Sequence, residues 1–177
     1  MDTVTLHDKT FRPFISEDKI LSAIKETALQ IQNDYDGLCP IFLGVLNGSF
    51  LFTADLVREF KGDCEVSFIR VASYEGTETT GEVKEVLGIK EDLKGRHIII
   101  IEDIVDTGNT LEKLYEIINK HNPASLKIAT LLYKPNAYTK DIPIDYASME
   151  VGNEFLVGYG LDYDGLGRNL KDIYILT

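Results

Sequence analysis

Cysteine, positive charge and long apolar stretches are all scarce in this chain of 177 residues. The two cysteines, Cys39 and Cys64, sit in apolar company without CxxC spacing or a nearby histidine cluster, so we expect buried thiols rather than a disulfide or a zinc site. No stretch reaches the roughly 18 consecutive apolar residues of a membrane span, and the opening MDTVTLHDKTFRPF lacks the basic and apolar regions of a secretion signal. These absences indicate a cytoplasmic protein.

The shortage of positive charge also limits the expected partners. Lysine and arginine number 18 against 29 aspartates and glutamates, which gives a formal net charge of −11. Broad binding to nucleic acid or to an anionic membrane needs a surface rich in lysine and arginine, so we expect neither. An anionic ligand would have to be bound locally, by backbone amides, a few basic side chains or a metal ion. With 44% hydrophobic residues, the chain predicts one globular domain over residues 1–177, large enough to enclose a cleft.

The chain is rich in alternating strand-like and helix-like segments. Ser16 is a plausible N-cap for a helix over 16–35, in which Ile20, Ile24 and Ile31 recur at helical spacing. Strands alternating with helices indicate an α/β fold, with a mostly parallel, twisted sheet flanked by helices. Two further helices are expected, one from the turn at Asn47 and Gly48 to about residue 60 and one over about 109–120. A long mobile loop or hairpin is expected over 75–86. The expected strands are 41–46, 64–74, 96–101, 125–134, 145–151, 155–161 and 173–176.

The stretch HIIIIEDIVDTGNTLEKLYEI, residues 97–117, carries the strongest chemical signal. Four isoleucines run into Glu102, Asp103 and Asp106, and residues 107–110 are then small or polar. The carboxyl ends of parallel strands carry ligands, and the helix that follows points its amide-rich N-terminus into the same crevice. Small residues let backbone N–H groups close around a phosphate, while adjacent carboxylates suit a pair of cis hydroxyls or a hydrated divalent ion.

Simpler interpretations of this stretch account for less of it. Asp106 could merely cap the following helix, but capping explains one carboxylate of three. The triplet DTG at 106–108 is the signature of aspartic proteases, which need two such aspartates, and the sequence has no second copy. Neither GxxxxGK[ST] nor GxGxxG occurs, so generic binding of a nucleoside triphosphate or NAD loses support.

The segment IIIIEDIVDTGNTL resembles the phosphoribosyl-diphosphate (PRPP) motif of the type I phosphoribosyltransferases. Four further segments are similar, in order and spacing from about residue 40 onward, to those of the hypoxanthine-guanine phosphoribosyltransferases. They are GVLNGSF for pyrophosphate, ASYEGTETTGEV for a mobile lid, LLYK for a purine-contacting strand, and FLVGYGLDYDGLGRNL for purine and metal. The resemblance implies the type I phosphoribosyltransferase fold, with a small hood from the chain ends and a mobile lid loop.

The resemblance also implies a purine-salvage transferase that uses Mg²⁺ and assembles as a homodimer or homotetramer. Such an enzyme joins hypoxanthine or guanine to PRPP and forms IMP or GMP with release of pyrophosphate. The residue chemistry fits this reaction. Breaking the C1–diphosphate bond creates an oxocarbenium-like centre, so the site must hold a polyanionic leaving group and exclude water.

By the same resemblance, Asp106 would take the proton from purine N7, and Lys134 would donate to the purine O6, which selects 6-oxopurines over adenine. On sequence alone, Lys134 could instead be a surface lysine, and Phe155, which would stack on the purine, could be a core aromatic. The resemblance further implies ribose and metal contacts for Glu102 and Asp103, metal and purine contacts for Asp162, and a purine contact for Leu156. The 5-phosphate would contact Thr107, Gly108, Asn109 and Thr110, and the pyrophosphate would contact Leu46, Asn47, Gly48 and Arg168. Ser73 and Tyr74 would belong to the lid.

Two positions depart from the family pattern, and two alternatives stay open. Many relatives carry lysine where this chain has Asn47, and some carry it in place of Asn109, so backbone amides and Thr110 would hold the phosphates with less help from side-chain charge. One alternative is a different base, such as xanthine. The other is a regulator that keeps the PRPP loop and binds nucleic acid, which would need a basic face that a chain at −11 does not display.

Overall fold

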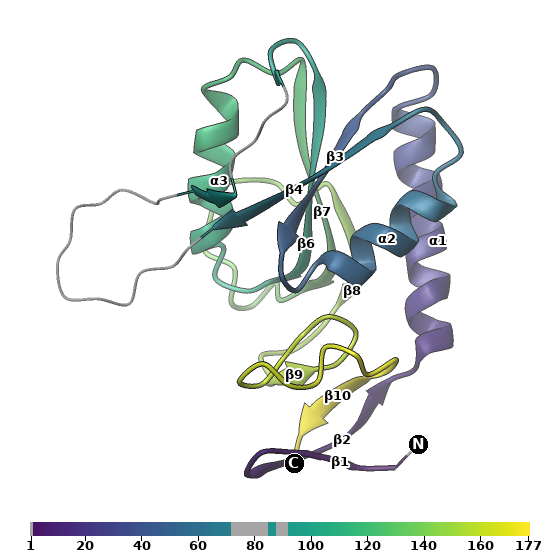
Figure 1. Ribbon diagram of the computed structural model, residues 1–177, viewed down its shortest axis with the longest axis vertical. Helices are drawn as coiled ribbons and strands as arrows, with labels where there is room; N and C mark the ends of the chain where they lie inside the picture. The colour runs from purple at the N-terminus through teal and green to yellow at the C-terminus, as the bar shows by residue number, and fades with distance from the viewer. Residues whose placement is uncertain (1, 72–84, 88–91) are drawn as a thin grey trace, which may run out of the picture.

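The computed structural model describes residues 2–71, 85–87 and 92–177, which form a larger α/β unit and a smaller hood (Figure 1). The α/β unit is built on a six-stranded sheet in the order β5-β4-β3-β6-β7-β8. All neighbours in this sheet pair in parallel except β5, which adds an antiparallel edge to β4. The strands are β3 (Ile41–Leu46), β4 (Glu65–Val71), β5 (Glu85–Leu87), β6 (His97–Val105), β7 (Ser125–Tyr133) and β8 (Tyr146–Glu150).

Helices cover both faces of this sheet (Figure 1). The helices α1 (Glu17–Asp34) and α2 (Phe50–Glu59) pack on one face, and α3 (Asn109–Asn119) packs on the other. Ser16 caps α1, since its hydroxyl accepts a hydrogen bond from the backbone N–H of Lys19 at 3.4 Å. The predicted α/β architecture and the three predicted helices are confirmed.

The central strand β6 explains why four isoleucines follow one another. Ile99 and Ile101 are buried in the core beneath α1 and α2, while Ile98 and Ile100 are buried in the core beneath α3. Successive side chains of a strand point to opposite faces, so a strand covered on both sides requires a continuous apolar run rather than an alternating one.

The hood joins the two ends of the chain. It is a four-stranded antiparallel sheet in the order β1-β2-β10-β9, with both termini at its outer edge (Figure 1). Two of its strands, β9 and β10, lie within segments predicted to be extended, but the sequence predicted no strand before Ser16. The hood strands are β1 (Val4–Leu6), β2 (Lys9–Ile15), β9 (Leu156–Val157) and β10 (Ile173–Leu176).

Several sequence-based expectations need correction or lie outside the described residues. The strand predicted over 96–101 continues to Val105, because Ile104 and Val105 also pair with β7. Cys39 is exposed and Cys64 only partly buried, so the expectation of buried thiols is wrong for Cys39. The predicted mobile loop over 75–86 lies outside the described residues apart from its last two positions, which belong to β5. Across the described ranges, no helix is long and apolar enough to cross a membrane.

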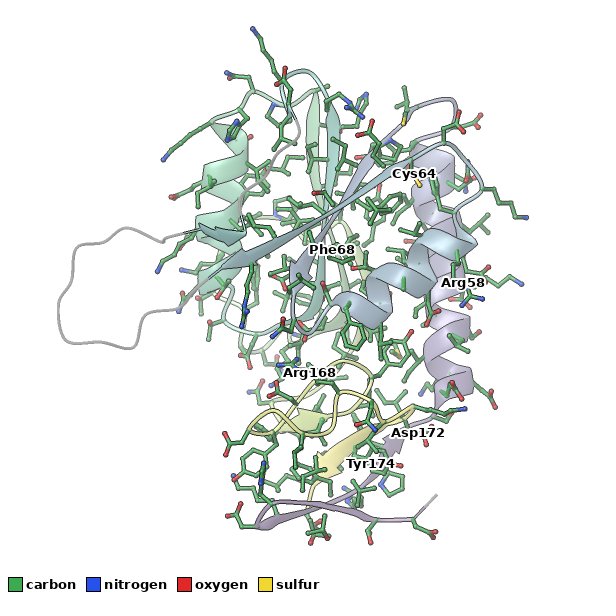
Figure 2. The ribbon with its side chains drawn as sticks, viewed as in Figure 1. Arg58, Cys64, Phe68, Arg168, Asp172 and Tyr174 are labelled. Atoms are coloured by element: carbon green, nitrogen blue, oxygen red, sulfur yellow. The ribbon has the colours of Figure 1, made fainter. Side chains whose placement is uncertain are left out.

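Polar contacts attach the hood to the α/β unit. The hydroxyl of Tyr159 donates to the Asp55 carboxylate of α2 at 2.5 Å, and burial together with this hydrogen bond raises the pKa of Tyr159. The Asp172 carboxylate accepts from the backbone N–H of Glu17, at the start of α1, at 2.7 Å (Figure 2). Because both contacts join the hood to the helical layer, they fix how the hood sits over the sheet.

We expect Tyr159→Phe to lower the free energy of unfolding by about 1–2 kcal/mol, because a partly buried hydrogen bond to a carboxylate is lost. Urea denaturation followed by far-UV circular dichroism measures the change. Tyr115→Phe is the matched control, since Tyr115 is half-buried against the core beneath α3 and its hydroxyl has no hydrogen-bond partner within the described residues. An equal loss in both variants would contradict an anchoring role for the Tyr159 hydroxyl.

Candidate active site

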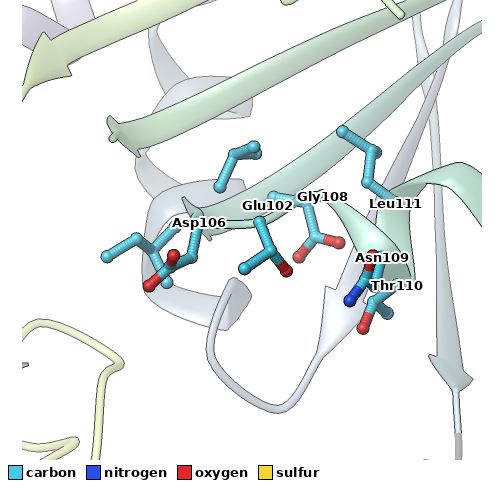
Figure 3. A pocket seen from close by; sticks show the side chains of 9 residues that line it. Glu102, Asp106, Gly108, Asn109, Thr110 and Leu111 are labelled. Carbon is cyan, nitrogen blue, oxygen red and sulfur yellow. The ribbon is translucent and has the colours of Figure 1, made fainter. Parts of the chain in front are cut away.

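A pocket lies where β6 ends and α3 begins. Its volume is about 120 Å³, several times the space that one water molecule needs, and it is lined by Glu102 and residues 104–111 (Figure 3). Carboxylates and the small residues of the loop thus share one cavity, as the sequence predicted. Glu102 and Asp103 lie within β6 rather than after it, and only Asp106 follows the strand.

The loop before α3 presents backbone amides rather than a side-chain cap. The N-cap residue of α3 is Gly108, so no side chain of the N-cap residue caps the helix. The φ angle of Gly108 is 84°, in the left-handed region that favours glycine. The alternative that Asp106 merely caps α3 is therefore wrong. Thr107, Asn109 and Thr110 are exposed around the first turn of the helix, where N–H groups lack partners within the helix. An anion of the size of phosphate fits this arrangement.

The surroundings of the two carboxylates inside β6 destabilise their ionised forms. Glu102 is 7% exposed, and burial, followed by the nearby charge of Asp103, raises its pKa well above the usual value. Burial raises the pKa of Asp103 to about 6, although its carboxylate accepts the backbone N–H of Ile104 at 2.9 Å and lies near Arg168. Such groups favour the approach of a cation.

The turn after β3 and the hood close over Asp103. A Cβ atom on Gly48 would overlap the Asp103 carboxylate, and one on Gly160 would overlap the carbonyl oxygen of Gly48, so both positions require glycine. The preceding peptide bond, Leu46–Asn47, is cis. The turn after β3, the acidic strand and the hood are therefore in direct contact.

Arg168 and Asp162 lie together at this junction. Their side chains form an ion pair at 2.7 Å, and Arg168 also donates to the carbonyl oxygen of Gly160 at 2.7 Å. Figure 2 shows Arg168 at the boundary between the hood and the α/β unit. The charge of Asp162 contributes to the raised pKa of Asp103, and the charge of Arg168 opposes it. These two predicted site residues are thus brought to the same end of the sheet as Asp103.

Lys134 and Asp106 form a second ion pair. Their side-chain atoms Nζ and Oδ2 are 2.9 Å apart, and the side chain of Lys134 is 9% exposed while that of Asp106 is 50% exposed. The backbone N–H of Lys134 also donates to the carbonyl oxygen of Val105, which keeps the ends of β6 and β7 together. Lys134 is therefore no surface lysine, and Asp106 is accessible to a ligand.

Phe155 has an open face and an aromatic support. It is 45% exposed, so the alternative of a core aromatic is wrong, whereas the adjacent Leu156 is buried. Its ring lies 5.9 Å from that of Tyr163, edge to face, and the Nζ atom of Lys9 lies 5.7 Å from its centroid. The support comes partly from the N-terminal hairpin, which the sequence analysis missed because its short strands carry no clear apolar periodicity.

A second group of residues beside the loop was also missed. Thr139, Lys140 and Tyr138 follow Lys134 and contact the loop through Thr107 and Gly108. No local pattern marks them, because their segment is neither helix nor strand. Ser73 and Tyr74, predicted to belong to a lid, lie outside the described residues.

The acidic side chains suit a magnesium ion that the substrate helps to bind. Within the described part of the chain, no group of three or more side chains forms a ready metal site. Glu102, Asp103 and Asp162 nevertheless supply carboxylate oxygens, which Mg²⁺ prefers, and burial leaves the first two in need of a cation. Mg²⁺ is usually bound by one or two carboxylates together with substrate phosphates, so this donor set fits it.

Comparisons with known proteins agree with this geometry. The phosphoribosyl transferase domain family matches residues 16–164. The chain is 42% identical to the hypoxanthine-guanine phosphoribosyltransferase of Streptococcus pneumoniae strain R6, over 92% of this chain and 91% of that protein. It is 41% identical to the hypoxanthine phosphoribosyltransferase of Haemophilus influenzae, over 88% and 89% of the two chains.

Solved structures give the same result. A hypoxanthine-guanine phosphoribosyltransferase from Bacillus anthracis superposes with a TM-score of 0.87 at 40% identity, covering 94% of this chain and 96% of that one. The matched domain and the shared sheet architecture define a type I phosphoribosyltransferase. Within that class, the chain belongs to the hypoxanthine-guanine phosphoribosyltransferase family, whose members are pentosyltransferases.

We expect Asp103→Asn to stabilise the metal-free protein at neutral pH. A carboxyl group whose pKa is raised on folding, here from about 3.9 to about 6, favours the folded state only while it is protonated, so its cost grows as the pH rises through this interval. In buffer with EDTA, urea denaturation should show a gain of about 1–3 kcal/mol at pH 7.5 and a much smaller gain at pH 4.5. Asp36→Asn, at an exposed position after α1, should show no such pH dependence. A gain independent of pH would contradict the raised pKa.

Proposed function

We propose that this protein joins hypoxanthine, and guanine as well, to PRPP, forming IMP or GMP and releasing pyrophosphate. The observation that carries the proposal is the ion pair of Lys134 and Asp106 at the mouth of the phosphate pocket. It provides a donor and an acceptor for a base beside a site that suits a sugar phosphate. The names of the relatives from S. pneumoniae and H. influenzae support the same reaction.

The phosphoribosyl group would bind along the end of β6 and the start of α3. Its 5-phosphate would accept hydrogen bonds from the amides and hydroxyls of residues 107–110. The ribose hydroxyls would donate to the carboxylates of Glu102 and Asp103, which are next to the same cavity. The diphosphate would extend toward the backbone of residues 46–48 and the guanidinium of Arg168, which binds phosphates through its forked donors.

The base would bind between the Lys134–Asp106 pair and Phe155. Lys134 has three donor hydrogens, so it can keep its contact with Asp106 and also donate to O6 of a 6-oxopurine. The amino group of adenine cannot accept that bond. The half-exposed carboxylate of Asp106 would take the proton from N7 as the ring nitrogen attacks C1 of the ribose. Phe155 would stack its open face on the purine.

Glu102, Asp103 and Asp162 are the residues that would hold Mg²⁺. When bound, the ion would neutralise the diphosphate as it leaves. The carboxylates would also orient the ribose, because Asp103 is held rigidly by the N–H of Ile104 and by the backbone of Gly48. Because these carboxylates are near both the cavity and Arg168, the leaving group and the ribose would bind on the same side of the sheet.

The direct test is pyrophosphate release by the purified protein with PRPP and Mg²⁺. Hypoxanthine, guanine, xanthine, adenine and uracil are offered in separate reactions. We expect turnover of hypoxanthine and guanine and none of adenine or uracil, because Lys134 requires an acceptor at position 6. Preferred turnover of xanthine would revise the base, and a folded protein that binds PRPP without turning over any base would refute the proposed activity in favour of a regulator.

Asp106→Asn should lower kcat about a hundredfold or more, because the amide cannot act as the general base. The dissociation constant of PRPP should change little, since the 5-phosphate and ribose contacts are elsewhere in the site. Steady-state kinetics and isothermal titration calorimetry measure the two quantities. Asp36→Asn is the control with the same chemical change at an exposed site away from the pocket. Near-normal turnover in Asp106→Asn would show that another group accepts the proton.

A further inference from the structure

The phosphate loop is unusually acidic. Between Glu102 and Glu112 the sequence contains four carboxylates, the other two being Asp103 and Asp106, and neither lysine nor arginine. The pocket that suits a phosphate lies within this stretch. A doubly charged phosphate would be repelled by any carboxylate that is not neutralised nearby. Positive charge therefore has to come from another part of the chain.

Residues 134–140, which follow β7, supply that charge at both ends of the loop. Lys134 pairs with Asp106 before the loop, and the Nζ atom of Lys140 lies 2.7 Å from the Glu112 carboxylate, which follows it in the first turn of α3. The side chain of Lys140 is 17% exposed, so this ion pair is more sheltered than an ordinary surface pair.

The same segment packs directly on the loop. Thr139 donates to the carbonyl oxygen of Thr107 through its backbone N–H at 3.4 Å and its hydroxyl at 3.3 Å. A Cβ atom on Gly108 would lie 2.8 Å from Cγ of Lys140 and 2.5 Å from the ring of Tyr138. The aliphatic part of Lys140 thus covers the left-handed turn that starts α3, while its ammonium group reaches Glu112.

We propose that Lys140 is a positioning residue for the 5-phosphate: it neutralises Glu112 and thereby lets the amides at the start of α3 bind an anion. The inference rests on the proposed function in one respect, that the loop binds a sugar phosphate. Lys140 makes no contact with the substrate in this role and acts through Glu112. In an environment between water and protein interior, removing one compensating charge should weaken phosphate binding about three- to tenfold.

The test is a double-mutant cycle with ribose 5-phosphate as the probe, because this ligand needs neither a base nor a diphosphate. Lys140→Met keeps most of the aliphatic stem over Gly108 and removes the charge, and Glu112→Gln removes its partner. We expect weaker binding in Lys140→Met, tighter or unchanged binding in Glu112→Gln, and restoration to within about twofold of wild type in the double variant. Isothermal titration calorimetry gives the dissociation constants.

Lys113→Met is the matched control, because Lys113 is exposed on the same helix next to Glu112 and its loss changes the net charge equally. Its dissociation constant should stay within about twofold of wild type, and thermal unfolding confirms that each variant folds. The effect of Lys140→Met should shrink between about 50 and 500 mM salt, because salt screens the unpaired charge of Glu112. In turnover assays, the KM for PRPP should rise in Lys140→Met while kcat stays within about twofold.

Two outcomes would overturn the inference. Equal weakening in Lys140→Met and the double variant would show that Lys140 acts independently of Glu112, and unchanged binding in Lys140→Met would show that the ion pair has no part in phosphate binding. The proposed function is tested separately. If the wild-type protein converts no base, but wild type and variants bind ribose 5-phosphate with the expected order of dissociation constants, the proposed function fails and the inference on Lys140 stands.

Discussion

The burial of two adjacent carboxylates inside the central strand is the constraint around which the site is organised. Glu102 and Asp103 continue β6 directly from its isoleucines, and Glu102 is 7% exposed while Asp103 is partly buried. Burial raises the pKa of both, which means that the ionised forms are held at a cost in folding free energy. A magnesium ion or donor hydroxyls of a sugar would relieve this cost, so binding free energy and folding free energy are linked at this strand.

The other parts of the site supply positive charge to this acidic strand from distant parts of the sequence. Arg168 comes from the hood, whereas Lys134 and Lys140 come from the segment after β7. Each of these cationic side chains also forms an ion pair with a carboxylate, so its charge is partly neutralised and does not bind anions nonspecifically. Under the proposed function, a phosphate group would therefore bind only where backbone amides point at it, although the protein as a whole is strongly acidic.

The sequence predicted the parts of this arrangement that depend on local patterns. The alternation of strands and helices indicated a sheet flanked by helices, and the small residues 107–110 indicated a turn that opens a helix, both of which the structure confirms. Contacts between distant segments left no such pattern. Nothing near Lys140 or Lys9 in the chain indicates that these lysines approach Glu112 or Phe155, and the strand end at Val105 depends on pairing with β7. The exposure of Cys39, too, is set by its position in the turn before β3 rather than by its apolar neighbours.

Burial also separates the tasks proposed for the three carboxylates, of which Glu102 and Asp103 lie within β6 and Asp106 follows it. Glu102 is 7% exposed, Asp103 lies under the backbone of Gly48, and the side chain of Asp106 is 50% exposed. A general base must reach the proton that it removes, which excludes a group enclosed by the sheet and favours the one at the open end. Conversely, a carboxylate that holds a metal ion and ribose gains from rigidity, which the enclosed positions provide. The strand thus carries the two enclosed acidic groups, and the accessible Asp106 follows directly after its last residue, Val105.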